Sequence, residues 1–299
     1  KSYFDASYGG VAGTFFNVAL VCAVCLGIYC LPGAKPDGVS VLAFFLTAGF
    51  CFWGTTILNI WFSFAGVALF AAVKKKSLGS MANAFLFSTG LAPLITEMLF
   101  RYPGESWHGF TTLGFVLALA VGVCIGFVFP AVLPHSPKMH KGYDLYNAAV
   151  PIGLTAFFLR ALLYKVFTPA PPTSEGVGLG DSFELVSLLF CGVVFGLAII
   201  WGLAMGGGRE YGKLLRASGY NADFGAQISP AAGVLNLGVY GVFIVLYYCA
   251  VGAVWNAATL GCVFCMVCCC FKGSHPLNVW PIMVGYVAAS FAAKFVCGL

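Results

Sequence analysis

Long apolar blocks follow one another along this chain, separated by short stretches in which polar and charged residues gather. The blocks span residues Val11–Leu31, Val39–Val73, Met81–Phe100, Phe110–Leu133, Leu145–Phe167, Phe183–Met205, Ala231–Phe271 and Pro276–Val296. Several are long enough to cross about 30 Å of hydrocarbon as a helix of about 20 residues. The blocks at 39–73 and 231–271 are too long for one crossing and must be divided. The pattern therefore predicts about ten helical membrane segments, a few of them half-length.

Composition supports this interpretation. Of the 299 residues, 61% are hydrophobic and 8% are charged, whereas soluble domains carry about 25% charged residues. The chain is therefore predicted to be an all-α polytopic membrane protein whose main partner is the lipid bilayer. It lacks the basic surface with interleaved aromatic residues that nucleic-acid binding needs, so we expect no nucleic-acid partner.

Charge placement predicts the topology. Basic residues gather at 74–76, 138–141 and 209–216, whereas the stretch 168–182 holds Glu175 and Asp181 and no basic residue. The positive-inside rule assigns the three basic loops to the cytoplasm and the acidic stretch to the outside. The predicted location is the plasma membrane, crossed many times.

Five cysteines near residue 265 invite a metal-site interpretation. They form the pattern C-x-x-C-x-x-C-C-C at positions Cys262, Cys265, Cys268, Cys269 and Cys270. Adjacent helical residues point about 100° apart, so the last three cannot converge on one ion. Buried free cysteine behaves as a small hydrophobe and suits close helix packing. Packing is the favoured interpretation, and we expect neither a metal nor a cofactor.

The chain also repeats itself. Residues 14–73 align without gaps on the stretch that begins at Gly233, at a constant offset of 219. The matching pairs include Asn17/Asn236, Tyr29/Tyr248, Gly54/Gly273, Asn59/Asn278, Trp61/Trp280 and Gly66/Gly285. So many coincidences at one offset make the repeat a specific signal.

Counting crossings predicts the geometry of the repeat. An odd number of predicted crossings separates the Asn17 segment from the Asn236 segment, so the two copies enter the membrane from opposite sides. We therefore predict inverted-topology repeats, with residues 1–166 as the first half, 167–182 as an extracellular linker and 183–299 as the second half. Inverted repeats with broken helices are a hallmark of transporters, whose substrate sites lie at the repeat interface.

Two polar stretches interrupt the repeats at matching positions. "FKGSHPLNVWPIM" (271–283) lies between two apolar blocks, and "WGTTILNIWF" (53–62) is its counterpart. Pro276 and Pro281 lack amide donors and disturb a helix. Broken backbone at membrane depth survives only where protein or a water-filled cavity satisfies it. These stretches are predicted to be junctions between half-length segments; an ordinary short loop at the membrane surface is the alternative.

Polar residues within or beside the apolar blocks are the candidate site. They are Asn17, Asn59, Asn236, Asn278, His275, Asp144, Asn147 and His140. The functional interpretation places them along a solute path. The structural alternatives are that the asparagines hold helices together and that Asp144 caps the helix that follows it. Glu97 is either an intramembrane functional acid or a side chain that reaches the surface beside Arg101.

Four blocks of the chain resemble a known family. The stretches "GTFFNVAL", "FCFWGTTILNIW", "STGLAPLITEMLFR" and "MHKGYDLYNAAVPIGL" are similar to those of the bacterial membrane family called domain of unknown function 1576. The chain departs from it at Asp144, where Asn is expected, and at Phe62, where Pro is usual. The resemblance implies no assigned activity, and it implies that a second "GTxLAPL" block follows residue 299. More remotely, the repeat pattern resembles the inverted halves of urea transporters.

These observations lead to two hypotheses. The first is a transporter or channel for a small polar or neutral solute, with its path at the interface of two inverted repeats; the second is a non-transporting subunit of a larger membrane complex. We expect no enzymatic activity, because the chain offers no nucleophile elbow, no H-E-x-x-H spacing and no phosphate-cradling loop. Whether copies associate into a homo-oligomer stays open.

Overall fold

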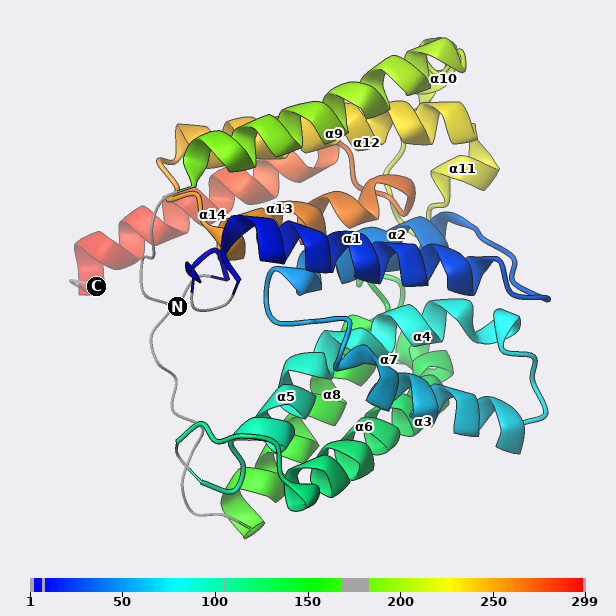
Figure 1. Ribbon diagram of the computed structural model, residues 1–299. Helices are drawn as coiled ribbons and strands as arrows, with labels where there is room; N and C mark the ends of the chain where they lie inside the picture. Colours follow the sequence, from blue (N-terminus) through cyan, green and yellow to red (C-terminus); the bar gives the residue numbers. More distant parts are fainter. Residues whose placement is uncertain (1–2, 7–8, 105, 168–182, 298–299) are drawn as a thin grey trace.

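The computed structural model describes residues 3–6, 9–104, 106–167 and 183–297, and within these residues the regular structure is helical (Figure 1). The α-helices are α1 (Gly10–Tyr29), α2 (Gly38–Cys51), α3 (Ile60–Val73), α4 (Ala82–Ser88), α5 (Ala92–Phe100), α6 (Thr112–Val132), α7 (Ser136–His140), α8 (Ala149–Ala161), α9 (Glu184–Ala204), α10 (Gly208–Leu214), α11 (Phe224–Gln227), α12 (Pro230–Ala250), α13 (Ala257–Val267) and α14 (Pro276–Cys297). A 3₁₀ turn, η6 (Cys268–Phe271), extends α13. The predicted linker falls, except for Phe167, outside the described residues.

The predicted membrane segments are present. Among the described residues, seven helical stretches are long and apolar enough to cross a membrane, and three shorter apolar helices lie at Gly38–Cys51, Ile60–Val73 and Ala257–Phe271. The long blocks at 39–73 and 231–271 are each divided, as predicted. By helix length and hydropathy the chain is a multi-pass membrane protein.

Two of the short helices begin in the same way. The Asp37 side chain accepts a hydrogen bond from the Ser40 amide at the start of α2, and the Asn256 side chain accepts one from the Thr259 amide at the start of α13. Both are N-cap interactions that satisfy an otherwise unpaired backbone donor. Asp37 and Asn256 are 219 positions apart, so the repeat extends to the start of these helices.

Glycines bring the helices into close contact. A Cβ at Gly66 on α3 would clash with the backbone of Val123 and Gly126 on α6, and one at Gly49 on α2 would clash with Gly261 on α13. Small residues let helix backbones approach closely in bilayers. The α2/α13 crossing therefore joins the two copies of the repeat directly.

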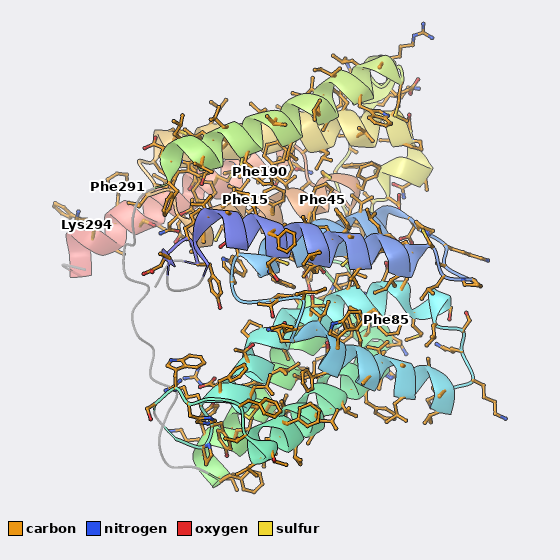
Figure 2. The ribbon with its side chains drawn as sticks, viewed as in Figure 1. Phe15, Phe45, Phe85, Phe190, Phe291 and Lys294 are labelled. Atoms are coloured by element: carbon orange, nitrogen blue, oxygen red, sulfur yellow. The ribbon has the colours of Figure 1, made fainter. Side chains whose placement is uncertain are left out.

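Aromatic residues fill the space around this crossing. Phe15 on α1 and Phe190 on α9 have ring centroids 4.7 Å apart (Figure 2), and Phe45 on α2 stacks near Phe264 on α13 at 6.2 Å. Cys268, Cys269 and Cys270 of η6 are buried in the same core, which agrees with the packing interpretation of the cysteines. Offset and edge-on ring pairs of this kind stabilise the core beyond their buried area.

Candidate functional site: two hairpin tips and their cavities

The polar interruptions form the tips of two helical hairpins with the same hydrogen bonds. The first tip, residues 52–59, joins α2 to α3. The Asn59 side chain donates to the Gly54 carbonyl oxygen (2.8 Å) and accepts from the Thr56 amide (2.8 Å). Gly54 has φ +107°, a conformation that favours glycine.

The second tip, residues 271–278, joins η6 to α14 and repeats this arrangement 219 positions later. The Asn278 side chain donates to the Gly273 carbonyl oxygen (2.7 Å) and accepts from the His275 amide (3.0 Å). Gly273 has φ +125°. The repeat predicted from sequence therefore extends to individual backbone contacts. Whether the tips lie at membrane depth or at the membrane surface stays a prediction.

The other pair of repeated asparagines braces these tips from neighbouring helices. On α1, the Asn17 side chain donates to the Thr55 carbonyl oxygen (3.0 Å) and accepts from the Ile57 amide (3.0 Å). On α12, the Asn236 side chain donates to the carbonyl oxygens of Ser274 (2.8 Å) and Cys270 (2.7 Å). Backbone groups that the broken helices leave unpaired thus find side-chain partners.

The four asparagines differ in how many of their side-chain N–H groups remain available to a ligand. Asn59 uses its second N–H on the Thr96 hydroxyl (2.9 Å). Asn236 uses both N–H groups and also accepts from the Tyr211 hydroxyl (3.3 Å). Among the described residues, Asn17 and Asn278 each keep one amide N–H without a partner. One spare donor therefore lies at each tip.

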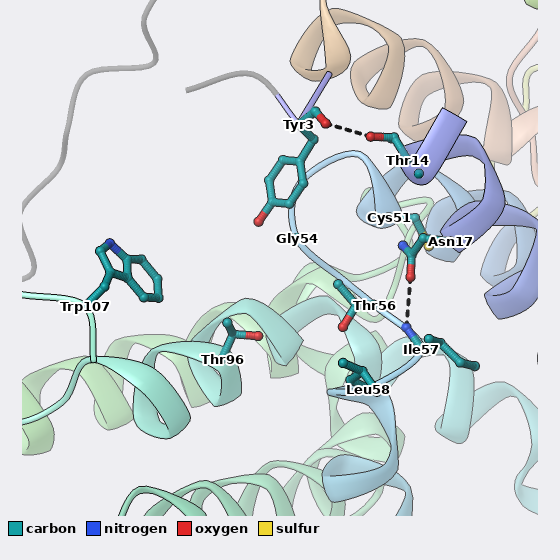
Figure 3. Close-up of a pocket in the computed structure, with 11 residues that line it drawn as sticks. Tyr3, Thr14, Asn17, Cys51, Gly54, Thr56, Ile57, Leu58, Thr96 and Trp107 are labelled. Carbon is teal, nitrogen blue, oxygen red and sulfur yellow. Dashed lines mark hydrogen bonds between the residues drawn. The ribbon is translucent and has the colours of Figure 1, made fainter. Parts of the chain in front are cut away.

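Each spare donor belongs to a cavity wall. The first-tip cavity, about 620 Å³, is lined by Asn17, Gly54, Thr56 and Thr96 among others. Figure 3 shows Asn17 at one side of this space and Trp107 at the other. No charged residue is among the described residues that line it. Its polar groups are an amide, hydroxyls, the Trp107 indole, the Cys51 thiol and backbone.

The second-tip cavity, about 580 Å³, lies beside the other hairpin. Asn278, Gly273 and Ser274 line it from the tip, and the segments 143–146 and 218–220 line it from two neighbouring loops. Asp144 is the one carboxylate among its described lining residues. This cavity therefore differs from its counterpart in having an acid and several tyrosines on its walls.

A third, inter-repeat cavity of about 300 Å³ brings together His140, Asp144 and Asn147 with Lys272 of the second tip. Val39 and Leu42 of α2 contribute apolar walls, and two further amides, Asn83 and Asn221, line it as well. The three residues predicted from the "HKGYDLYN" stretch do lie together. Asp144 belongs to the walls of this cavity and of the second-tip cavity.

The hydrogen bonds of His140 define its neutral form. Its Nδ1 accepts from the amides of Gly142 (3.1 Å) and Asp144 (3.2 Å). The proton must then be on Nε2, which donates to the Asn147 side-chain oxygen (2.8 Å). His140 thereby holds the loop before α8 in shape.

The structural alternative for Asp144 is wrong. Helix α8 begins at Ala149, without a side-chain cap. Asp144 Oδ1 accepts instead from the Tyr146 amide (3.0 Å), which closes a local turn. The left-handed conformation of Asn147 (φ +53°) delays the helix beyond the reach of the carboxylate. Asp144 Oδ2 is buried and has no hydrogen-bond partner among the described residues.

His275 and Glu97 lie elsewhere. The His275 ring is 1% exposed, its Nε2 lies 2.9 Å from the Ala217 carbonyl oxygen, and its burial lowers the pKa of the imidazole. It is not among the residues that line the three cavities. Glu97 pairs with Arg101 one turn later (2.8 Å). A role for either residue in a solute path stays a prediction.

Several cavity residues escaped the sequence analysis. Thr96, Asn83 and Asn221 are single polar residues outside the aligned stretches of the repeat, and Tyr143 and Tyr220 meet only through the folded chain, with ring centroids 5.7 Å apart. Only Thr96 could have been found from the sequence. It lies four residues after Ala92 of the "LAPL" block, so the two residues share one face of helix α5.

The family described as "Protein of unknown function (DUF1576)" matches residues 3–165 and 208–295. The chain belongs to the DUF1576 family. The match covers both tips and all three cavities of this DUF1576 protein. Among curated proteins and among solved structures nothing matches, so the likeness to urea transporters stays a prediction.

Proposed function

We propose that this DUF1576 protein carries a small polar solute across the membrane along a path between its two repeats. The observation that carries this proposal is the pair of tips: the same asparagine and glycine framework occurs twice, each time beside a cavity that receives a spare amide N–H. Transporter sites are typically built where discontinuous helices from two repeats meet.

The directions of the helices support an inverted arrangement of the repeats. In Figure 1, α1 runs away from the end of the molecule where both chain termini lie, whereas α12, which carries the matching asparagine, runs toward that end. The end of α3 and the helix α10, both next to basic stretches, lie at the opposite end. The positive-inside rule would place that end in the cytoplasm.

The chemistry of the cavities favours solutes that carry an oxygen acceptor. A spare amide N–H in an apolar wall binds a carbonyl or hydroxyl oxygen and discriminates against a solute without one, because the buried donor would then remain unpaired. Transport from one tip to the other requires that the two cavities open to opposite sides of the membrane in turn. Two separate cavities, one beside each tip, are compatible with this alternating access.

Uptake into liposomes tests the proposal. Purified protein would be reconstituted and the uptake of radiolabelled urea, glycerol and choline compared with that of empty liposomes. We expect protein-dependent uptake of at least one. Replacing Gly13 by Phe should then reduce that uptake about tenfold or more, because Gly13 lines the first-tip cavity and has open space around it. A hydrophobic plug in a narrow path blocks conduction without touching the tip.

Gly27→Phe is the matched control. Gly27 lies on the same helix, also has nothing within contact of an added Cβ, and is not among the residues that line the first-tip cavity. It should leave uptake unchanged. Equal uptake in both variants, or no uptake of any probe by wild-type protein, would count against transport.

One observation favours the second candidate, a non-transporting subunit of a membrane complex. All four repeated asparagines bond to tip backbone, which is what a purely structural role requires. Under this candidate Asn278→Leu lowers stability and nothing else. Under the transport proposal the same variant abolishes uptake even when it is fully folded, because it removes the spare N–H of the second-tip cavity.

A further inference from the structure

One carboxylate lies on the walls of two of these cavities. Asp144 is the only acidic residue among the described residues that line the two tip cavities and the inter-repeat cavity. Its Oδ1 accepts from the Tyr146 amide, and its Oδ2 is buried without a partner. A buried carboxylate without a counter-charge is costly, and a cation nearby offsets that cost.

The protein supplies no such cation on the walls of the second-tip cavity. No lysine or arginine is among the described residues that line it. Lys272, on the wall of the inter-repeat cavity, is engaged by Asp223 (3.6 Å). The Lys141 carbonyl oxygen accepts a hydrogen bond from the Tyr220 hydroxyl (2.7 Å), and Lys141 itself is exposed. The electrostatic balance of this cavity is therefore negative.

Aromatic rings complete the same walls. Tyr143, Tyr146, Tyr220 and Tyr240 line the cavity together with Met266. The Tyr146 hydroxyl is tied to the Cys265 carbonyl oxygen (2.8 Å), and the Tyr143 and Tyr220 rings are in contact at the exposed side of the cavity. Tyrosine faces carry negative electrostatic potential and attract ammonium groups, the quaternary ones above all.

We propose that the second-tip cavity binds a small organic cation, an ammonium group with an apolar body, between Asp144 and these tyrosines. The proposal rests on the proposed function in that it names the class of its solute. The spare N–H of Asn278 on the same wall suits an oxygen atom elsewhere on the ligand. A metal ion fits poorly, since one carboxylate oxygen and aromatic faces do not make a coordination shell.

Binding rather than transport tests this site. Radiolabelled choline would be titrated onto the purified full chain in detergent, in competition with tetramethylammonium, with acetate and with 3,3-dimethylbutan-1-ol, the neutral isostere of choline. We expect choline and tetramethylammonium to bind, and the isostere to bind at least about tenfold more weakly, because it lacks the charge that Asp144 and the rings attract. Acetate should not compete.

Asp144→Asn should weaken choline binding at least about tenfold, because it removes the charge and keeps the oxygen that accepts from Tyr146. Asp37→Asn is the matched control: it makes the same change on a residue that lines none of these cavities, and the matching residue of the other repeat is already Asn256. It should bind choline like wild type.

A second pair of variants keeps the test sharp if Asp144→Asn folds poorly. Tyr220→Leu should weaken choline binding, whereas Tyr220→Trp should retain it, because Trp preserves the aromatic face. Absence of choline binding to wild type, equal binding of the neutral isostere, or wild-type binding by Asp144→Asn would each overturn the proposal.

The outcome is separable from that of the proposed function. Choline that binds but does not accumulate in liposomes leaves the cation site standing and removes transport of this solute. Urea or glycerol uptake that Gly13→Phe abolishes, in a protein that does not bind choline, keeps transport and removes the cation site.

Discussion

The two tips share one framework and differ in what covers it. In the first tip, Trp53 donates to the Ala258 carbonyl oxygen of the other repeat (3.2 Å), and the side chain of Tyr3 lies over Gly54. In the second, Lys272 takes the position of Trp53 and pairs with Asp223, while the backbone of Gly219 lies against Gly273. A side chain covers the first tip and a loop, residues 215–223, covers the second.

The comparison distinguishes residues that form the backbone framework of a tip from residues that make the two cavities chemically different. The repeated asparagines and glycines bond to backbone and recur at one offset. The residues that give each cavity its character lie outside the aligned stretches of the repeat: Thr96 at the first tip and Asp144 beside the second. We infer that the aligned stretches supply the scaffold and that residues outside them supply the chemistry.

The largest expected difference between the tips is at their glycines. A Cβ at Gly273 would clash with the carbonyl oxygen of Gly219, whereas one at Gly54 would meet the hydroxyl end of Tyr3, which can rotate away. Both glycines have positive φ. We expect Gly273→Ala to destabilise the protein by about 3 kcal/mol and Gly54→Ala by about 1–2 kcal/mol, measured by thermal unfolding in detergent. Equal losses would mean that the covers do not matter.

The bracing asparagines should differ next. Asn236→Ala leaves two buried carbonyl oxygens without a donor, and its residue is fully buried, so we expect a loss of about 2–3 kcal/mol. Asn17→Ala leaves the Thr55 carbonyl oxygen and the Ile57 amide unpaired beside a cavity that water can enter, and should cost about 1 kcal/mol. Thermal unfolding in detergent measures both losses of stability. A larger loss for Asn17→Ala than for Asn236→Ala would contradict the conclusion that water can enter the first-tip cavity.

Much of this fold could be predicted from sequence because the solvent of the chain is apolar. Helices must satisfy their own backbone in lipid, so an apolar block such as 112–132 can hardly form anything else, and the division of 231–271 followed from length alone. The constant offset identified Asn59 and Asn278 before any coordinates. The hydrogen bonds themselves were not predicted, since they depend on the backbone conformation of Gly54 and Gly273.

The cavities could be predicted only in part. That His140, Asp144 and Asn147 lie together could be predicted, because they are neighbours in sequence. The residue at which helix α8 begins could not be predicted, because the left-handed backbone at Asn147 moves the start of the helix beyond Asp144. Lys272 and Asn221 meet these residues through contacts between distant segments. Such contacts carry no local periodicity, and they define where the carboxylate lies.

Acidification should separate the tips by a smaller amount. Burial lowers the pKa of His275 in the second tip, whereas the matching residue of the first tip is Thr56, which does not titrate. Below its ordinary pKa of about 6.5 the unfolded chain binds the proton more readily than the folded one, so stability falls as pH drops through this window. The slope contributed by this one group is at most about 1.4 kcal/mol per pH unit.

His275→Thr, which copies the first tip, should make unfolding less dependent on pH between about 6.5 and 5. The difference between wild type and variant isolates this group, because all other titrating groups are common to both proteins. An unchanged pH profile would mean that the ring takes up its proton in place, with the Ala217 carbonyl and the neighbouring Phe224 ring accommodating the charge.

The smallest expected effect concerns the covering ion pair of the second tip. Lys272 and Asp223 are 3.6 Å apart, and each side chain is about one-fifth exposed (21% and 20%), so Lys272→Met should change stability by at most about 1 kcal/mol, and less at high salt. The counterpart, Trp53→Phe, removes one neutral hydrogen bond from a half-exposed indole and should cost a similar amount with no dependence on salt. Unfolding measured at low and high salt checks both variants.

A salt-sensitive loss of stability for Lys272→Met alone would show that an ion pair covers the second tip and a neutral hydrogen bond the first. A loss of stability well above about 1 kcal/mol for Lys272→Met would mean that Lys272 is paired more tightly than this distance allows.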